Sequence, residues 1–342
     1  ASEPITINGG EITSTLSGTV QGTISLGADS YFTASSDKTL TVSGAIGGSY
    51  GVIVGAAGKT GSVVFSGTNT YSGATTVSQG ILKANGSGGF NSSTITIDDG
   101  ATFDLNGQTI SNALILSGAG VGGNGVLINS STTLGTASGA ITLNASSTIS
   151  SNNSITVSGV VSSGTSNFGL TKAGIGTLIL SNSNTYLGST TINAGTIAIS
   201  GDNGIGATPG TVTTASLVLN GGALRATATF EISANRGISL GSSGGTISVD
   251  SGVNTTYAGI LADSGSFTKT GSGTLILSGD NTYGGSTSIS AGTLVSNRSG
   301  GVIPTASAVT VDGTLDLRYD TSLGSLAGSG VVTSTTSGAK TL

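Results

Sequence analysis

Side chains able to carry catalytic or metal chemistry are sparse in this sequence. There is no His and no Cys, and only 15 acidic residues are scattered over 342 positions. A Ser-His-Asp triad needs a histidine base and a thiolate metal site needs cysteine, so both are excluded. The pair of carboxyl groups that glycoside hydrolysis needs is also not evident. We therefore predict that the protein is not an enzyme and has no catalytic, cofactor-binding or metal-binding residues.

Three acidic segments come nearest to a site. Asp316, Arg318 and Asp320 would share one face of a strand, because side chains on a strand alternate with period two. We interpret them as a surface ion pair, which contributes little stability. The turns Asp98-Asp99-Gly100 and Asp202-Asn203-Gly204 could bind Ca²⁺ weakly. The nonapeptide pattern of calcium-binding β-rolls is missing, so we expect ordinary Asx turns.

The charge and composition limit the possible partners and the location. Charged residues are 7% of the chain and the net charge is −5, with no basic cluster that could contact nucleic-acid phosphates. No apolar run is long enough to cross a bilayer. Cys and Met, the two easily oxidised side chains, are both absent. With the start at Ala1 and the segment ASEP, this predicts a mature secreted chain whose signal peptide has been removed.

The most regular motif is Asn-Thr-Tyr, which occurs three times with fixed spacing to two later glycines. Its members are Asn69, Tyr71, Gly73 and Gly80; Asn184, Tyr186, Gly188 and Gly195; and Asn281, Tyr283, Gly285 and Gly292. We interpret it as a structural turn, in which Asn tolerates a left-handed conformation and bonds its own backbone while Tyr covers a coil edge. The alternative is a row of exposed Tyr rings that stack on sugars.

The elements that must position these residues are short strands. Runs rich in β-branched residues end in Gly, Asn, Ser or Asp, while strong helix formers are rare. The predicted strands include Thr94–Ile97, Thr102–Leu105, Ile141–Leu143, Ile155–Val157, Leu178–Leu180, Leu217–Leu219, Thr246–Val249, Leu275–Leu277 and Thr314–Leu317. Only 4% aromatic residues disfavour a β-sandwich core. The sequence therefore predicts an all-β parallel β-helix, with Leu178, Leu180, Leu275 and Leu277 facing inward and Ile179 and Ile276 outward.

Internal repetition supports the same architecture. Related copies lie near residues 52–85 (closest over 61–85), 169–200 and 266–297, and each is too short and polar to bury a core alone. Such units become stable by stacking on neighbours, at roughly 20 residues per coil. Since no linker interrupts the composition, we predict one elongated domain over residues 1–342.

The third copy, GTLILSGDNTYGGSTSISAGTL, closely resembles the autotransporter-associated β-strand repeat, also called the passenger-associated transport repeat. The stretches DDGATFDLNGQTI (98–110) and VDGTLDLRY (311–319) also look like passenger coils. The resemblance implies a right-handed parallel β-helix of a type V secretion passenger, exported through an outer-membrane translocator barrel to the surface of a diderm, Gram-negative-type bacterium. No C-terminal barrel is present in this sequence.

These patterns predict a non-catalytic extracellular structural or adhesive protein that acts through self-association, filament formation or a biofilm matrix. The end of the chain, SGAKTL, shows no capping sequence, so we expect either end-to-end contacts between copies or a longer precursor. The partners would be other copies of the chain and surface glycans, with no cofactor and no nucleic acid. The alternatives are a glycan-binding adhesin and a carbohydrate-active β-helix enzyme.

Overall fold

The computed structural model describes residues 2–86, 89–90, 94–336 and 340–342. Residues 337–339, in the segment expected to lack a cap, lie outside the described residues. By its internal contacts the chain divides into two compact units, Ala1–Leu187 (unit 1) and Gly188–Leu342 (unit 2).

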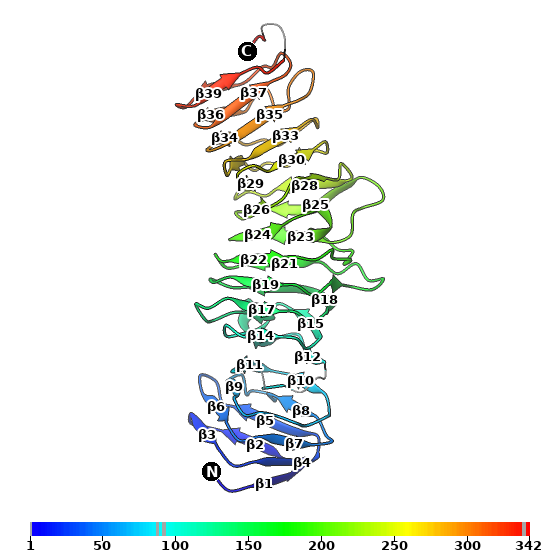
Figure 1. Cartoon of the computed structure of the whole chain (residues 1–342), viewed down its shortest axis with the longest axis vertical. Coiled ribbons are helices and arrows are strands. Elements are labelled where there is room, and N and C mark those ends of the chain that lie inside the picture. The colour runs from blue at the N-terminus through cyan, green and yellow to red at the C-terminus, as the bar shows by residue number, and fades with distance from the viewer. Residues whose placement is uncertain (1, 87–88, 91–93, 337–339) are drawn as a thin grey trace. The chain divides into compact units, whose positions relative to one another are not determined.

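Unit 1 is built from short strands that follow one another along the chain (Figure 1). Its strands are β1 (Ile5–Asn8), β2 (Glu11–Ser14), β3 (Gly18–Val20), β4 (Ile24–Ala28), β5 (Ser30–Ala34), β6 (Thr39–Val42), β7 (Ile46–Gly48), β8 (Val52–Val54), β9 (Ser62–Phe65), β10 (Thr75–Val77), β11 (Gly80–Ala84), β12 (Ile95–Ile97), β13 (Ala101–Asp104), β14 (Thr109–Ile110), β15 (Leu114–Gly118), β16 (Leu127–Ile128), β17 (Gly135–Ala137), β18 (Ile141–Ser150), β19 (Ile155–Val157), β20 (Val161–Ser162), β21 (Leu170–Ala173) and β22 (Thr177–Leu180).

Unit 2 has the same construction. Its strands are β23 (Thr190–Ile192), β24 (Thr196–Ile199), β25 (Thr213–Leu219), β26 (Ala223–Ala226), β27 (Phe230–Ile232), β28 (Arg236–Leu240), β29 (Gly245–Val249), β30 (Asn254–Tyr257), β31 (Leu261–Ala262), β32 (Phe267–Thr270), β33 (Thr274–Leu277), β34 (Thr287–Ile289), β35 (Thr293–Ser296), β36 (Ala308–Val311), β37 (Thr314–Leu317), β38 (Ser325–Ala327) and β39 (Val331–Thr333).

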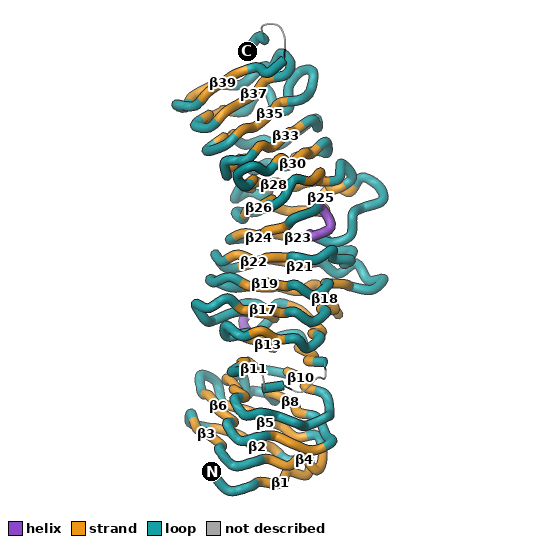
Figure 2. The backbone as a smooth tube through the Cα atoms, in the orientation of Figure 1, coloured by secondary structure: helices purple, strands orange, loops and turns teal. Residues whose placement is uncertain are grey.

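Helix is nearly missing from the described part of the chain. It holds two short 3₁₀ turns, η1 (Val121–Gly123) and η2 (Asp202–Ile205), drawn in purple in Figure 2. Neither is long and apolar enough to cross a membrane. The prediction of an almost all-β chain is confirmed.

Strand pairing confirms a parallel β-helix in each unit. In unit 1, Leu82 pairs with Val63 on one side and with Phe103 on the other, about 20 residues away in each direction. In unit 2, Leu294 pairs in the same way with Leu275 and Leu315. Each strand pairing within the described residues of a unit is parallel. Each coil therefore completes the hydrogen bonding of the coil before it, which the sequence repetition predicted.

The ladders follow the stack of coils. In unit 1 two long ladders run β2–β5–β8–β10–β12–β15–β18–β20 and β3–β6–β9–β11–β13–β16–β18–β21. In unit 2 the ladders are β23–β25–β28–β31, β24–β26–β29–β32–β34–β36–β38 and β27–β30–β33–β35–β37–β39.

Each stretch predicted as a strand overlaps one in the structure. Ile155–Val157 and Thr314–Leu317 have the predicted bounds. The largest difference is β18, predicted over Ile141–Leu143 and observed to continue to Ser150. Its first half pairs with β15 and its second half with β16, so that one strand serves two ladders.

The core lies inside the coils and is formed by alternate residues of the strands. Leu178 and Leu180 are buried and Ile179 is half-buried, as predicted for β22, and the same alternation holds in β33. Unit 1 also contains a file of four Phe rings, with neighbouring ring centroids 5.4 to 6.3 Å apart, formed by Phe32, Phe65, Phe90 and Phe103. Rings stacked from coil to coil supply bulk that the small residues lack.

Candidate functional site

The Asn of each Asn-Thr-Tyr copy is buried and bonds to neighbouring coils. In unit 2, Asn281 Oδ1 accepts a hydrogen bond from the backbone N–H of Leu261 (2.8 Å), and its Nδ2 donates to the carbonyl of Val302 (2.7 Å). One amide thus joins the coil before it to the coil after it. The same contacts recur in unit 1, where Asn69 bonds Ile46 and Gly89, and Asn184 Oδ1 accepts from the N–H of Val161.

The predicted role of this Asn is wrong in its details. The sequence predicts an Asn that bonds its own backbone in a turn where a left-handed conformation is tolerated. Among the described non-glycine residues, positive φ occurs at Asp37, Asn106 and Asp263, not at the motif positions. The amide bonds instead to coils about 20 residues away, because the stacking brings their unpaired backbone groups to the corner of the motif.

The Tyr of each copy lies inside its coil. Tyr71, Tyr186 and Tyr283 are at most 1% exposed. The hydroxyl of Tyr71 is 2.6 Å from Thr75 Oγ1, and that of Tyr283 is 2.7 Å from Thr287 Oγ1. Burial raises the pKa of Tyr71 and of Tyr283 to about 12. These rings neither cover a coil edge nor offer a face to a sugar.

The glycines of the motif meet two different needs. Gly80, Gly195 and Gly292 have φ of 70°, 65° and 65°, a conformation that favours glycine. Gly73 and Gly285 lie against the backbone of the preceding coil, where a Cβ would collide with it. The remaining motif glycine, Gly188, is half-buried.

The sequence analysis did not identify two buried lysines. Lys172 and Lys269 are 1% and 0% exposed and occupy the same position in two repeat copies. Lys269 Nζ donates to the carbonyls of Thr270 (2.7 Å) and Gly271 (2.8 Å), and Lys172 Nζ bonds the two residues that follow it in the same way. Burial lowers the pKa of both lysines to about 8. The shared spacing Thr-Lys-x-Gly-x-Gly-Thr was the available signal.

A buried ion pair replaces one of the predicted Asx turns. Asp202 belongs to η2, and its carboxylate accepts two hydrogen bonds from Arg236 of β28, at 2.8 and 3.2 Å. Arg236 is 2% exposed and also donates to the carbonyls of Ile205 (3.2 Å) and Gly206 (3.0 Å). The guanidinium therefore fastens a loop that leaves the coil. At the other predicted Asx turn the structure has a backbone turn instead: Gly100 has a φ of 79°, and the N–H of Ala101 bonds the backbone carbonyl of Asp98.

The acidic cluster near the end of β37 does not assemble as one site. Asp316 is 3% exposed and accepts hydrogen bonds from the N–H and hydroxyl of Thr335, and Arg318 Nε lies 3.8 Å from it. Asp320 is exposed and bonds the backbone N–H of Thr341. The predicted surface ion pair thus has a buried carboxylate whose main partner is the next coil. Among the described residues no group of three acidic side chains could hold a metal ion.

Comparison with known proteins agrees with this geometry. A family model described as Passenger-associated-transport-repeat matches residues 60–84, 170–199 and 267–295, the three copies that carry the Asn-Thr-Tyr motif. The chain is also 33% identical, over 297 residues, to Adhesin BmaC autotransporter of Brucella suis biovar 1 (strain 1330). The chain is autotransporter passenger sequence. The match covers 84% of this passenger sequence and 8% of that relative's length. No solved structure matches the passenger chain.

Proposed function

We propose that this passenger chain is a non-catalytic adhesive surface displayed outside a Gram-negative bacterium. Its similarity to an autotransporter named as an adhesin supports this proposal, and so does the repeat family. Export through an outer-membrane translocator barrel follows from the same family. Charged residues are 7% of the chain and aromatic residues 4%, so we expect uncharged polar groups to make the adhesive contacts.

The observation that carries the proposal is a row of hydroxyl groups along unit 2. Thr246, Thr268, Ser288 and Thr310 are register partners on successive strands of one ladder. None is buried, and alternation directs them away from the core. Neighbouring strands lie about 4.8 Å apart, so the row presents hydroxyl groups at a fixed and repeated spacing.

Such a row suits adhesion by many weak contacts. Each hydroxyl group donates one hydrogen bond and accepts others, so it can bond to most polar surfaces. One such bond contributes little binding free energy, because it replaces a hydrogen bond to water. Several contacts on one rigid body bind together more strongly, because the first contact raises the effective concentration of the others. Two carboxylates of unit 2 are held in ion pairs, Asp202 with Arg236 and Asp250 with Arg225.

The test is an adhesion assay with the whole 342-residue chain. Beads coated with the chain should attach to cultured host-cell monolayers more than beads coated with serum albumin at equal density. Replacing Thr268 and Thr310 by Lys interrupts the row with two charges and should reduce attachment. Attachment equal to that of the albumin beads would contradict the proposal.

Self-association is a second candidate, favoured by the chemistry of the same row. Hydroxyl groups are self-complementary, so rows on two copies can bond to each other without opposite charges. Lateral pairing of this kind would support a filament or a biofilm matrix. Sedimentation over a range of concentrations should show species larger than the monomer, which the Thr268→Lys and Thr310→Lys changes should remove. A chain that stays monomeric at the highest concentration excludes this candidate and leaves adhesion to other surfaces in place.

A further inference from the structure

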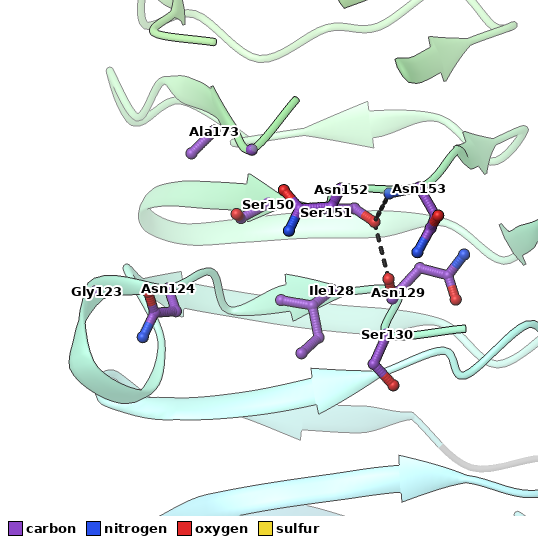
Figure 3. A pocket seen from close by; sticks show the side chains of 11 residues that line it. Gly123, Asn124, Ile128, Asn129, Ser130, Ser150, Ser151, Asn152, Asn153 and Ala173 are labelled. Carbon is purple, nitrogen blue, oxygen red and sulfur yellow. Dashed lines mark hydrogen bonds between the residues drawn. The ribbon is translucent and has the colours of Figure 1, made fainter. Parts of the chain in front are cut away.

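A trough with a volume of about 570 Å³ opens on unit 1 (Figure 3). Its floor is formed by Ile128, Ser150 and Ala173, which are register partners on β16, β18 and β21. Three successive coils thus contribute one residue each. The volume lies in the range of sites that bind small molecules.

The two sides of the trough come from different parts of the coils. On one side lie Gly123 and Asn124, at the end of the excursion that contains η1. On the other side lie Asn129, Ser130 and the segment 151–153, where the coils turn a corner. The trough therefore has a loop on one side and a corner of the stack on the other.

The corner is held rigidly by Asn129, which is 2% exposed. Its Oδ1 accepts from the N–H of Gly107 (2.8 Å), and its Nδ2 donates to the carbonyls of Thr133 (2.8 Å) and Ser154 (2.9 Å). Ser151 Oγ then donates to the carbonyl of Asn129 (2.9 Å). The amide of Asn129 and the hydroxyl of Ser151 already have hydrogen-bond partners, so they fix the shape of the trough. Other side chains must make the hydrogen bonds to a ligand.

The groups left for a ligand are amides and a hydroxyl. Within the described residues, the side-chain amides of Asn124 and Asn153 and the hydroxyl of Ser150 have no protein hydrogen-bond partner. Asn152 is exposed, and its Oδ1 accepts only a long bond of 3.4 Å from the N–H of Ile175. Amides and hydroxyls both donate and accept, so they match a ligand that carries many hydroxyl groups.

Charge around the trough favours an uncharged ligand. No lining residue is ionisable. Lys172 lies behind the wall, and its ammonium is bonded to the carbonyls of Ala173 (2.6 Å) and Gly174 (2.5 Å). Behind Ser130, Lys83 and Asp104 lie 3.6 Å apart and offset each other's charge. The Lys83–Asp104 pair is therefore neutral overall, and the Lys172 ammonium is bonded to backbone carbonyls.

An extended peptide fits the trough poorly. The backbone of the floor is already engaged, because Ser150 in β18 pairs with both β16 and β21. Peptides that add a strand to a sheet need free backbone groups at an edge. A ligand here must be recognised by side chains, with the methyl groups of Ile128 available to its C–H face.

From this geometry we propose that the trough binds a neutral oligosaccharide. The inference rests on the proposed adhesive function, to which it gives a class of target and a place. The proposed sugar site is therefore the trough and not the Tyr rings of the Asn-Thr-Tyr motif, which are buried. The amides of Asn124 and Asn153 bond the sugar hydroxyl groups from opposite sides, and the file of Ile128, Ser150 and Ala173 supports the ring faces.

The experiment is binding of neutral oligosaccharides by the whole chain. Tetramers built from glucose, galactose, mannose or N-acetylglucosamine are screened on an array, and hits are titrated by calorimetry. At least one should bind. Asn124→Ala or Asn153→Ala should weaken binding by about three- to tenfold, the value of one hydrogen bond. Ala173→Tyr, which fills the floor, should abolish it.

The matched control is Thr171→Tyr, which places the same ring on an outward position of the same strand but not among the lining residues. It should leave binding unchanged. Circular dichroism checks the fold of each variant, and Asn124→Ala lies in an exposed loop where the coil stack is undisturbed. Failure of every neutral tetramer to bind overturns the proposal, as does binding that survives Ala173→Tyr.

The two proposals fail differently. If coated beads adhere to cells but no oligosaccharide binds, the trough assignment is overturned and adhesion stands. If the chain binds an oligosaccharide but the beads do not adhere, the trough is supported and the adhesive function is lost.

Discussion

At the scale of single residues, the buried amide of the Asn-Thr-Tyr motif replaces two ladder hydrogen bonds. At coil corners the strands end and their backbone groups would be left without partners. Asn281 satisfies one N–H and one carbonyl from two different coils. An unpaired buried group costs about 1–3 kcal/mol, so the amide is a stabilising element despite its polarity.

Replacing Asn281 by Ala should therefore lower the free energy of unfolding by about 2–4 kcal/mol, because Leu261 N–H and the Val302 carbonyl both lose their partner. Urea unfolding followed by circular dichroism measures the change. The neighbouring exposed Thr282 supplies the control, since Thr282→Ala should stay within about 0.5 kcal/mol of the parent. Equal effects of the two changes would contradict the bridging role.

The buried lysines and tyrosines predict how stability varies with pH. Burial lowers the pKa of Lys172 and Lys269 from 10.5 to about 8, so between these values the unfolded chain binds more protons and the free energy of unfolding rises with pH. The raised pKa of Tyr71 and Tyr283, about 12 against 10, reverses the sign between pH 10 and 12. Stability should pass through a maximum near pH 10.

Urea unfolding at several pH values, from about 7.5 to about 11.5, tests this profile. In the double variant Lys172→Met and Lys269→Met the rise below pH 10 should vanish while the fall above it remains. A rise that persists without the two lysines would show that other groups cause it.

At the scale of elements, a single side chain of β28 fastens the loop that contains η2. Arg236 bonds both the carboxylate of Asp202 and the carbonyls that follow it, 30 or more positions earlier in the chain. Tyr257 in turn donates its hydroxyl hydrogen to the carbonyl of Arg236 (2.8 Å). The loop thus has a fixed place on unit 2 although it belongs to no ladder.

Arg236→Met should lower the free energy of unfolding by about 3–5 kcal/mol, because Asp202 and several carbonyls lose a buried cation. Limited proteolysis should then cut within residues 200–212. Arg225→Met removes an exposed ion pair, with Asp250, and should change stability by less than about 1 kcal/mol. A similar loss of unfolding free energy in the two variants would mean that the buried ion pair stabilises the protein no more than the exposed one.

At the scale of the whole molecule, stability comes from contacts between successive coils. Each inward residue packs on the residues one coil before and one coil after it, as Leu294 does on Leu275 and Leu315. In repeat proteins of this kind, stability is approximately a sum of terms within repeats and between nearest neighbours. A change in one coil should therefore act locally.

Leu294→Ala creates a cavity and should cost about 2–5 kcal/mol. Amide hydrogen exchange should become faster in β33, β35 and β37 and stay unchanged in β26 of the same unit. Leu326→Ala, at a position 46% exposed, is the control and should alter exchange little. Faster exchange throughout unit 2 would instead indicate that its coils unfold together.

The sequence by itself determined the strands and their stacking. Period-two alternation in GTLILSG determined which of Leu178, Ile179 and Leu180 are buried. Each of the three similar copies is too short to bury a core alone, so each required a neighbouring coil. Both signals are local, because alternation is read within one strand and repetition by comparing segments. The absence of His and Cys likewise limits the possible chemistry.

Only the tertiary structure decided what each polar residue contacts. The bridge made by Asn281, the partner of Arg236 and the three-coil floor of the trough all join residues about one coil or more apart. Their pairing depends on the lengths of the loops between strands, which vary from coil to coil and follow no local rule. For the same reason Tyr283 was expected at a coil edge and is found inside, where the stacked coils leave room for its ring.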